Sequence, residues 1–102
     1  MDFRIIKSPT RGTMEMLDRR RSLARPIEEY TQYDAVGLVQ GKLLDMVAAA
    51  DVAEKAASVH VEEIRGLCPQ HFALLGIFGD TASVEAAVRA VKVMESEERQ
   101  GF

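Results

Sequence analysis

The sequence has a single cysteine, Cys68, among its 102 residues. One cysteine excludes a disulfide within the chain, and a reducing cytoplasm disfavours one between chains, so we expect a thiol or a metal ligand. Long apolar runs are also lacking, because the uncharged stretch that includes Leu67–Gly79 is too short to span a bilayer and contains Pro69 and Gln70. Residues 1–12 lack the apolar region of a secretion signal. We therefore expect a cytoplasmic protein that is not embedded in a membrane.

An excess of basic residues is lacking as well. The chain has 13 Lys and Arg against 16 Asp and Glu, a formal net charge of −3, which creates no overall field that would attract nucleic acid or an anionic membrane. The local exception is the run Arg19–Arg21, which we interpret as solvated surface. A glycine-rich phosphate loop is missing too, since Gly37–Lys42 has neither the length nor the hydroxyl residue of a Walker A loop. Nucleic acid and nucleotides are therefore poor candidates as partners.

What is present is the composition of an ordinary globular domain, with 47% apolar and 28% charged residues. A chain of this length buries roughly 65% of the surface that its unfolded form exposes, enough for one compact core. The sequence shows no internal repeat and no low-complexity segment. We therefore expect a single folded domain.

The central part of the chain predicts two strands around a helix. A short apolar run ending at a glycine predicts a buried strand over Asp34–Gly41. The six alanines of Lys42–Ser58 favour a helix that packs closely against its neighbours. Alternating valines predict a second strand from Val59 to about Gly66, with a bulge or an exposed edge where Glu62 and Glu63 interrupt the alternation.

The C-terminal part predicts a core strand followed by an amphipathic helix. Phe72–Phe78 is apolar throughout except for one glycine, which is typical of a central strand covered on both faces. Asp80 or Thr81 can then cap a helix whose apolar residues share one face, and the polar segment Glu95–Gln100 indicates a fraying end.

The N-terminal third is expected to begin with a hairpin. Phe3–Ile6 and Thr13–Arg19 are the two candidate strands, and Pro9–Gly12 is the turn between them. From Ser22 to Tyr33, around Pro26, we expect a loop with at most one helical turn. The complete order of elements predicts an α+β protein, a mixed sheet with helices packed on it.

Cys68 is the residue most open to chemistry, and three interpretations remain for it at this point. It can be a half-buried thiol in a turn that Pro69 stiffens. It can be a nucleophile with His71 as base, although no third group or oxyanion site is identifiable. It can be a metal ligand, but a zinc site needs about four ligands, and the chain offers only Cys68, His71 and the distant His60.

Two other titratable groups are given no role. His60 lies among apolar residues of an expected strand and is interpreted as packed or exposed rather than as a ligand. Glu62 and Glu63 are adjacent on the same strand, so they point to opposite faces and cannot act together. We expect both carboxylates to be solvated.

Three segments in order, DAVGLVQG (34–41), AADVAEKAASV (49–59) and FALLGIFGDTASVEAAVRAV (72–91), resemble the bacterial microcompartment shell domain. The segment RIIKSPTRGTMEML (4–17) is similar to the start of the circularly permuted members of that family. The resemblance implies a single permuted domain over residues 1–102. Residues 1–33 would then be permuted N-terminal strands with a connecting loop, and residues 34–102 a core of strand, helix, strand, strand and helix.

The resemblance also implies an assembly and a location. Shell proteins of this family form flat homohexamers that tile with other shell proteins around encapsulated enzymes, in a microcompartment within the cytoplasm. Their central pore is lined by the loop that here comprises Gly66, Leu67, Cys68, Pro69, Gln70 and His71. Lys55 falls where the family carries a lysine at the hexamer edge, although an ordinary exposed helix lysine is an equal alternative.

The run GLCPQH departs from the glycine- or serine-rich pore loop of most relatives. It resembles the divergent shell protein of glycyl-radical propanediol microcompartments, which the resemblance associates with an iron–sulfur cluster at the pore. A [4Fe–4S] cluster takes about four thiolates, and a six-fold ring brings six copies of Cys68 to one axis. The cluster would therefore be shared between subunits with some copies of Cys68 left free, and His71 is a conceivable substitute ligand.

The expected function is thus that of a non-enzymatic shell subunit with a pore-bound iron–sulfur cluster, used for electron transfer across the shell. Two alternatives stay open. The first is a metal-free shell subunit whose pore controls the passage of metabolites. The second is a small oligomeric regulatory domain that binds a ligand between subunits.

Overall fold

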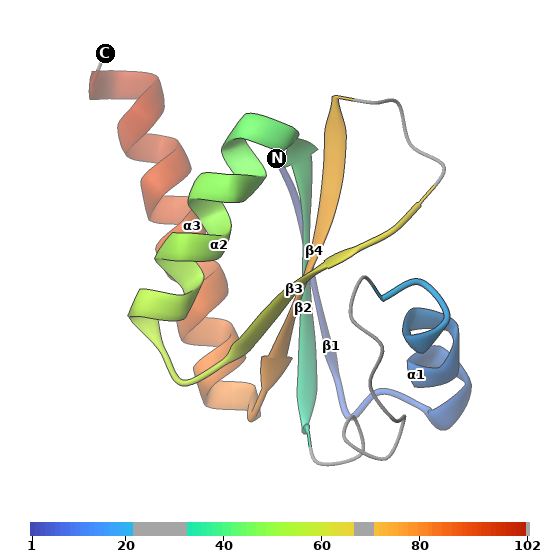
Figure 1. The fold of residues 1–102 in the computed structure, drawn as a ribbon. Helices are drawn as coiled ribbons and strands as arrows, with labels where there is room; N and C mark the ends of the chain where they lie inside the picture. The colour runs from blue at the N-terminus through green and yellow to red at the C-terminus, as the bar shows by residue number, and fades with distance from the viewer. Residues whose placement is uncertain (22–32, 67–70, 102) are drawn as a thin grey trace.

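The computed structural model describes residues 1–21, 33–66 and 71–101 of the chain. Over these ranges the chain forms a sheet with helices on both of its faces (Figure 1). The elements in order are β1 (Asp2–Lys7), α1 (Arg11–Asp18), β2 (Ala35–Lys42), α2 (Leu43–Ala56), β3 (His60–Ile64), β4 (Phe72–Gly79) and α3 (Thr81–Gly101).

The strand order in the sheet is β1-β2-β4-β3, and each neighbouring pair is antiparallel. The α+β class is confirmed, but the mixed sheet that we expected is wrong for the described strands. The connection through α2 does make β2 and β3 parallel, yet β4 lies between them and pairs with both, so this β-α-β unit is split.

The predicted central strand is confirmed, because β4 lies between β2 and β3. Successive side chains of a strand point to opposite faces. Ile77 accordingly packs in the cluster beneath α2 and α3, while Phe78 packs in a second cluster with Met14 and Leu17 of α1. Figure 1 shows the same arrangement, with α2 and α3 on one side of the sheet and α1 on the other.

The helices α2 and α3 lie close to the sheet. Ala49 and Ala53 of the predicted alanine-rich helix are fully buried, as close packing requires. At Gly37 of β2, an added Cβ atom would lie 2.9 Å from Cγ2 of Val88 and 3.1 Å from Cγ1 of Val84. Glycine at this position therefore lets α3 approach the sheet backbone.

The predicted N-terminal hairpin is wrong, because α1 stands where its second strand was expected. The hydroxyl of Thr10 accepts a hydrogen bond from the backbone N–H of Thr13 (3.2 Å) and caps the helix. Met14 and Leu17, three residues apart, share one helix face and are both buried. The methionines at 14 and 16 that suggested a strand lie on different faces, and Met16 is half exposed.

The remaining predictions concern element ends. β3 pairs with β4 residue by residue, so the alternative of an edge strand is confirmed and that of a bulge is wrong. Asp80 caps α3 as expected, since its carboxylate accepts from the backbone N–H of Ser83 at 2.8 Å. The expected fraying end of α3 is helical up to Gly101. The expected loop 22–33 lies outside the described residues except at Tyr33.

None of the helices in the described ranges combines the length and the apolar character that a membrane crossing requires.

Candidate pore loop and its surroundings

The GLCPQH segment connects β3 to β4, two neighbouring antiparallel strands. Its first and last residues, Gly66 and His71, are exposed at the same end of the sheet. Leu67, Cys68, Pro69 and Gln70 lie outside the described residues. The structure therefore describes the two points from which the Cys68 loop departs and the elements that hold those points.

The loop's second end is held by α2. The backbone carbonyl of His71 accepts a hydrogen bond from the N–H of Leu43 at 2.6 Å. The first N–H groups of a helix have no partner within the helix, so this bond satisfies one of them from outside. It fixes the start of β4 to the N-terminus of α2.

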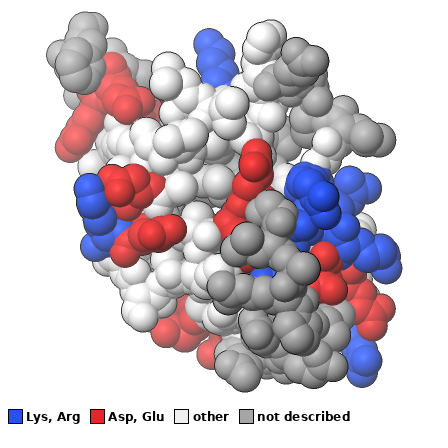
Figure 2. All heavy atoms as spheres, in the orientation of Figure 1, with Lys and Arg blue, Asp and Glu red and all other residues white. Residues whose placement is uncertain are grey.

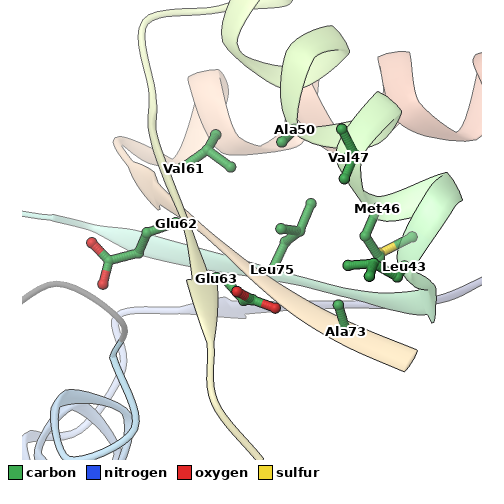
Figure 3. A pocket seen from close by; sticks show the side chains of 9 residues that line it. All are labelled: Leu43, Met46, Val47, Ala50, Val61, Glu62, Glu63, Ala73 and Leu75. Carbon is green, nitrogen blue, oxygen red and sulfur yellow. The ribbon is translucent and has the colours of Figure 1, made fainter. Parts of the chain in front are cut away.

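An apolar groove opens beside this end of the sheet, between α2 and the strands β3 and β4 (Figure 3). It has a volume of about 290 Å³ and is lined by Leu43, Met46, Val47, Ala50, Val61, Glu62, Glu63, Ala73 and Leu75. Four large apolar side chains of α2 and β4 are exposed, two of which line the groove: Leu43 (48%), Leu44 (82%), Val47 (65%) and Phe72 (45%). We call these four residues the α2 apolar surface. Such a cluster of exposed apolar side chains is typical of an interaction site.

The loop's first end is held by a buried ionic group on the opposite face of the sheet. The guanidinium of Arg21 donates to both carboxylate oxygens of Glu62, from Nε to Oε1 at 2.5 Å and from Nη2 to Oε2 at 3.0 Å. Both side chains are almost fully buried, with exposed fractions of 3% and 2%. Nε2 of His60 lies 2.5 Å from Oε2 of the same carboxylate, and Nη1 of Arg21 lies 3.3 Å from Oδ1 of Asp18. We call Arg21, Glu62 and His60 the Arg21 network.

The electrostatics of this network keep Glu62 ionised. Burial by itself raises the pKa of the Glu62 carboxyl, but hydrogen bonds and charge from Arg21 and His60 outweigh burial and lower the pKa below its ordinary value. For Arg21, burial disfavours the charged form, but the pairing with Glu62 and Asp18 raises its pKa above the ordinary value. The pair is therefore a full ion pair at neutral pH.

The prediction that Glu62 and Glu63 are solvated is wrong for Glu62, and that of a solvated arginine run is wrong for Arg21. Figure 3 shows the two carboxylates leaving β3 in opposite directions, with Glu63 on the groove side. Their placement on opposite faces is as predicted. Ile64 was the signal in the sequence that could have predicted the burial of Glu62. The two residues are two positions apart on one strand and share a face, and an isoleucine on that face is expected to be buried, as it is. His60 is packed on this face, as one of its two interpretations had it.

The backbone also joins the N-terminal segment to the end of β3. The N–H of Arg65 donates to the carbonyl of Arg20 at 2.6 Å. Arg21 forms an antiparallel bridge with Ile64, the last residue of β3. The segment that follows α1 therefore lies along β3 at the point where the Cys68 loop begins.

Lys55 lies near the C-terminal end of α2, and its side chain is 76% exposed. Its ammonium is 2.7 Å from the carboxylate of Asp51, one helical turn earlier. An exposed position suits either of its two interpretations, so contact between hexamers stays a prediction.

Charges of both signs cover the face seen in Figure 2, with acidic side chains prominent over α2 and α3 and basic ones gathered at the right, on the side of α1. The described ranges hold no group of three or more His, Cys, Asp and Glu side chains placed to bind a metal ion.

The family model of the BMC domain matches residues 35–99, from β2 to near the end of α3. The chain therefore belongs to the BMC domain family and is a structural shell protein of a bacterial microcompartment. Proteins of this family are structural rather than catalytic, so the expectation of a non-enzymatic protein is confirmed. The family supports the shell hypotheses over that of a regulatory ligand-binding domain. No curated protein matches the chain.

Among solved structures, the chain is similar to the ligand-free GrpU microcompartment shell protein from Clostridiales bacterium 1_7_47FAA. The identity is 46%, the match covers 100% of each chain, and the TM-score is 0.72. GrpU from Pectobacterium wasabiae, also ligand-free, shares 37% identity over 89% of this chain and 99% of its own, with a TM-score of 0.68. The resemblance to this branch of shell proteins is thus confirmed.

The permuted fold is supported by a third structure, a fused permuted hexameric shell protein from the RMM microcompartment. It shares 24% identity, and the match covers 93% of this chain and 45% of that one, with a TM-score of 0.71. A likeness at this identity concerns the fold alone.

Proposed function

We propose that this shell protein forms homohexamers in which several copies of Cys68 hold one [4Fe–4S] cluster at the central pore. The observation that carries the proposal is the place of the only thiol, in the short connection between β3 and β4. Each subunit can bring only one such donor. A cyclic assembly with this connection at its axis would bring the donors together.

The donor chemistry fits an iron–sulfur cluster held by several subunits. Such clusters are bound by about four cysteine thiolates. Six equivalent copies of Cys68 exceed that number, so the ligands in one ring would not all be equivalent. His71, exposed at the end of the loop, is the donor nearest to Cys68 in the sequence among the described residues, and its imidazole could replace one thiolate.

When bound, the cluster would supply reversible one-electron transfer, which we propose serves passage of electrons from a donor on one side of the shell to an acceptor on the other. The residues of the chain would hold and orient it. The competing function is a pore without metal that controls the passage of metabolites.

The α2 apolar surface supports an assembly of copies of this chain. Leu44, 82% exposed, and Val47, 65% exposed, would each contribute roughly 1.5–3 kcal/mol if a neighbouring subunit buried them fully. The fused permuted shell protein from the RMM microcompartment, which shares the fold, is hexameric. We propose the same number for this chain, with Lys55 at the edge where hexamers and other shell proteins meet, around encapsulated enzymes.

Mass and iron content, measured on the same anaerobic sample, test the proposal. We expect a particle of six chains with bound iron and brown colour from broad absorption at roughly 400 nm. Cys68→Ala should remain hexameric and lose the iron, and His71→Ala should keep at least part of it. A hexamer of the native chain without iron would support the metal-free pore, and iron retained by Cys68→Ala would contradict the assigned ligand.

Assembly is tested separately with Leu44→Asp, which places a charge on the α2 apolar surface. We expect loss of the hexamer by light scattering while the circular dichroism spectrum of the subunit is kept. The matched control is Met16→Asp, which changes an apolar residue that is 50% exposed on α1, at the opposite face of the sheet. A hexamer in both variants would show that the α2 apolar surface is not the subunit interface.

The role of Lys55 is tested with Lys55→Ala. The hexamer should form as in the native protein, while assembly of hexamers into extended sheets, followed by electron microscopy, should be lost. Lys92→Ala, an exposed lysine on α3, is the control. Sheets formed equally well by Lys55→Ala would leave the residue as an ordinary helix lysine.

A further inference from the structure

We propose that the surface formed by Met16, Arg19, Arg20 and Arg65 is a docking site for an acidic segment of a partner protein. We call these four exposed residues the α1 arginine surface. Met16 belongs to α1, two of the arginines follow α1 directly, and Arg65 follows β3 directly. The proposal goes beyond the shell function proposed above and requires neither a metal nor Cys68.

The backbone brings arginines from two distant parts of the chain together. The N–H of Arg65 donates to the carbonyl of Arg20 at 2.6 Å, and the adjacent residues Arg21 and Ile64 form an antiparallel bridge. Arg20 and Arg65 are therefore opposite each other in this pairing. Like charges that are directly opposite on paired chains destabilise the pairing. A partner that brings negative charge to this position would relieve the repulsion.

Met16 supplies an apolar side chain beside the arginines. The N–H of Arg19 donates to the carbonyl of Glu15 at 3.2 Å, so the helical turn continues past the end of α1. Met16 and Arg19 are three residues apart on this turn and thus share one face. Met16 is 50% exposed. Methionine adapts its shape to different partners, and both methionine and arginine are enriched in protein interfaces.

The acidic side chains near this surface are already paired with other arginines. Glu15 pairs with Arg11 at 3.1 Å, and Asp18 pairs with Arg21 at 3.3 Å. Among the described residues, no ion pair includes any of the three arginines of the surface. The dipole of α1 favours cations at its C-terminal end, which accounts for the two arginines after α1 but not for the third, after β3.

The surface rests on a rigid base. Beneath it, the guanidinium of Arg21 donates to both carboxylate oxygens of Glu62, at 2.5 and 3.0 Å. Ile64 packs with Met14 and Leu17 of α1 in the buried cluster of this face. A binding surface that is already ordered loses less conformational entropy when a partner binds. The backbone positions of the exposed arginines are therefore set before binding.

The chemistry of the surface fits a short acidic segment that carries an apolar side chain. A guanidinium binds a carboxylate with two parallel hydrogen bonds, and the apolar side chain would contact Met16. A long polyanion would also meet the rest of the molecule, whose net charge is −3 and whose acidic side chains are prominent over α2 and α3 (Figure 2). A short segment senses mainly charges within about 10 Å at roughly 0.1 M salt.

The test is fluorescence anisotropy of a labelled glutamate-rich peptide with one central leucine. Arg20→Glu and Arg65→Glu should each weaken its binding about tenfold or more, because attraction becomes repulsion. The matched control is Arg89→Glu, which makes the same change in net charge at an exposed position on α3 and should alter the affinity less than about twofold. Circular dichroism checks that each variant is folded.

Two results of this experiment would overturn the proposal. The first is a native chain that binds the glutamate-rich peptide no better than the same peptide with glutamine in place of each glutamate. The second is an equal loss of affinity in all three variants, since this would assign the effect to net charge. Tighter binding of single-stranded RNA, or of vesicles of an anionic phospholipid, through the same arginines would likewise contradict an acidic segment as the partner.

Met16→Asp gives a second readout. It should remain hexameric and bind the glutamate-rich peptide about tenfold more weakly, whereas Met16→Leu should bind it as the native chain does. Loss of the hexamer in Met16→Asp would place this surface between subunits and refute docking of another partner there. A native chain that forms no hexamer would contradict the function proposed above, while peptide binding by Arg20→Glu and Arg65→Glu would still decide this proposal.

Discussion

The two faces of the sheet are built on different principles. Beneath α2 and α3 the buried residues form one continuous apolar cluster, from Ala35 of β2 to Val91 of α3. On the face of α1 the apolar cluster is smaller, and it adjoins Arg21 and Glu62, the buried charged residues of the described ranges. The family model matches residues 35–99, so all buried residues of the first cluster lie within the matched region, whereas the second cluster also needs Met14 and Leu17 of α1.

The difference teaches what each face contributes. Apolar packing is non-directional and stabilises the fold in proportion to buried area. A buried ion pair contributes little net stability but tolerates few geometries. The face of α2 and α3, with the larger apolar cluster, therefore provides the greater part of the stability of the subunit, and the face of α1 also fixes how the N-terminal segment lies against β3.

The largest effect is expected when the ion pair between Arg21 and Glu62 on the α1 face is broken. Arg21→Met leaves the Glu62 carboxylate buried without its main partner and should cost about 3–5 kcal/mol in the free energy of unfolding. Adding Glu62→Leu should restore most of that loss. Urea unfolding at one fixed protein concentration measures both, since assembly makes stability depend on concentration. A double variant as unstable as the single one would mean that the pair is a major source of stability, and the contrast between the faces would disappear.

The next effect compares apolar residues of the two faces. Ile77, fully buried beneath two helices, and Met14 of α1, 5% exposed, both leave cavities when changed to alanine. Such changes cost about 2–5 kcal/mol, and the cost rises with the cavity that remains. We expect Ile77→Ala in the upper half of this range and Met14→Ala in the lower half, because a single helix can move to fill the space. Equal losses of unfolding free energy in the two variants, measured with urea, would contradict the proposed difference between the two faces.

A smaller effect is the pH dependence that Glu62 creates. Its pKa is lower in the folded protein than in the unfolded chain, so the ionised form stabilises the fold above roughly pH 4.3, the ordinary glutamate value, and this stability is lost as pH falls through the folded pKa. The stability difference between the native chain and Glu62→Gln should therefore be largest near neutral pH and shrink below about pH 4. Unfolding by urea across that range measures it.

Glu63→Gln is the control for the pH experiment, because Glu63 is exposed on the other face of β3. Its difference from the native chain should stay small at every pH. A difference between the native chain and Glu62→Gln that did not change with pH would show that the carboxylate charge of Glu62 is not what holds Arg21.

Most of the first face was predictable from the sequence, for physical reasons. The apolar run Phe72–Phe78 and the alanine-rich segment Lys42–Ser58 carry their burial in their own composition, and the structure confirms both. The second face was not predictable in the same way. Arg21 and Glu62 are 41 residues apart, and neither has a neighbourhood that reveals an ion pair formed only in the folded chain.

The candidate site divides along similar lines. The place of Gly66 and His71 at one end of the sheet was predictable, because the two strands on either side of the loop were predicted correctly. The contacts that hold these ends, from Arg20 and Leu43, are backbone hydrogen bonds, which any residue can make. They have no sequence pattern and could be found only in the structure. The ligand role of Cys68 stays a prediction, since the residue lies outside the described ranges.

The smallest expected effect compares the two helix caps, one on each face. The Asp80 carboxylate accepts from the N–H of Ser83 at 2.8 Å and from its hydroxyl at 3.0 Å, and the backbone hydrogen bond from Ser83 lowers the pKa of Asp80. The Thr10 hydroxyl accepts from the N–H of Thr13 at a longer distance, 3.2 Å, and shares a hydrogen bond of 2.9 Å with the Thr13 hydroxyl. Loss of a cap costs about 0.5–2 kcal/mol, and a carboxylate also interacts favourably with the helix dipole.

We therefore expect Asp80→Ala to cost more than Thr10→Ala in the free energy of unfolding by urea, with Asp80→Asn recovering most of the loss. The cap of α3 was predicted because an acidic residue follows a glycine directly before an apolar helix pattern. The cap of α1 was missed because Thr10 sits in a segment that also fits a turn between strands. If Thr10→Ala costs more, α1 depends more on its own cap than on the Arg21 network that follows it, and the N-terminal segment would be held from its first turn rather than from its end.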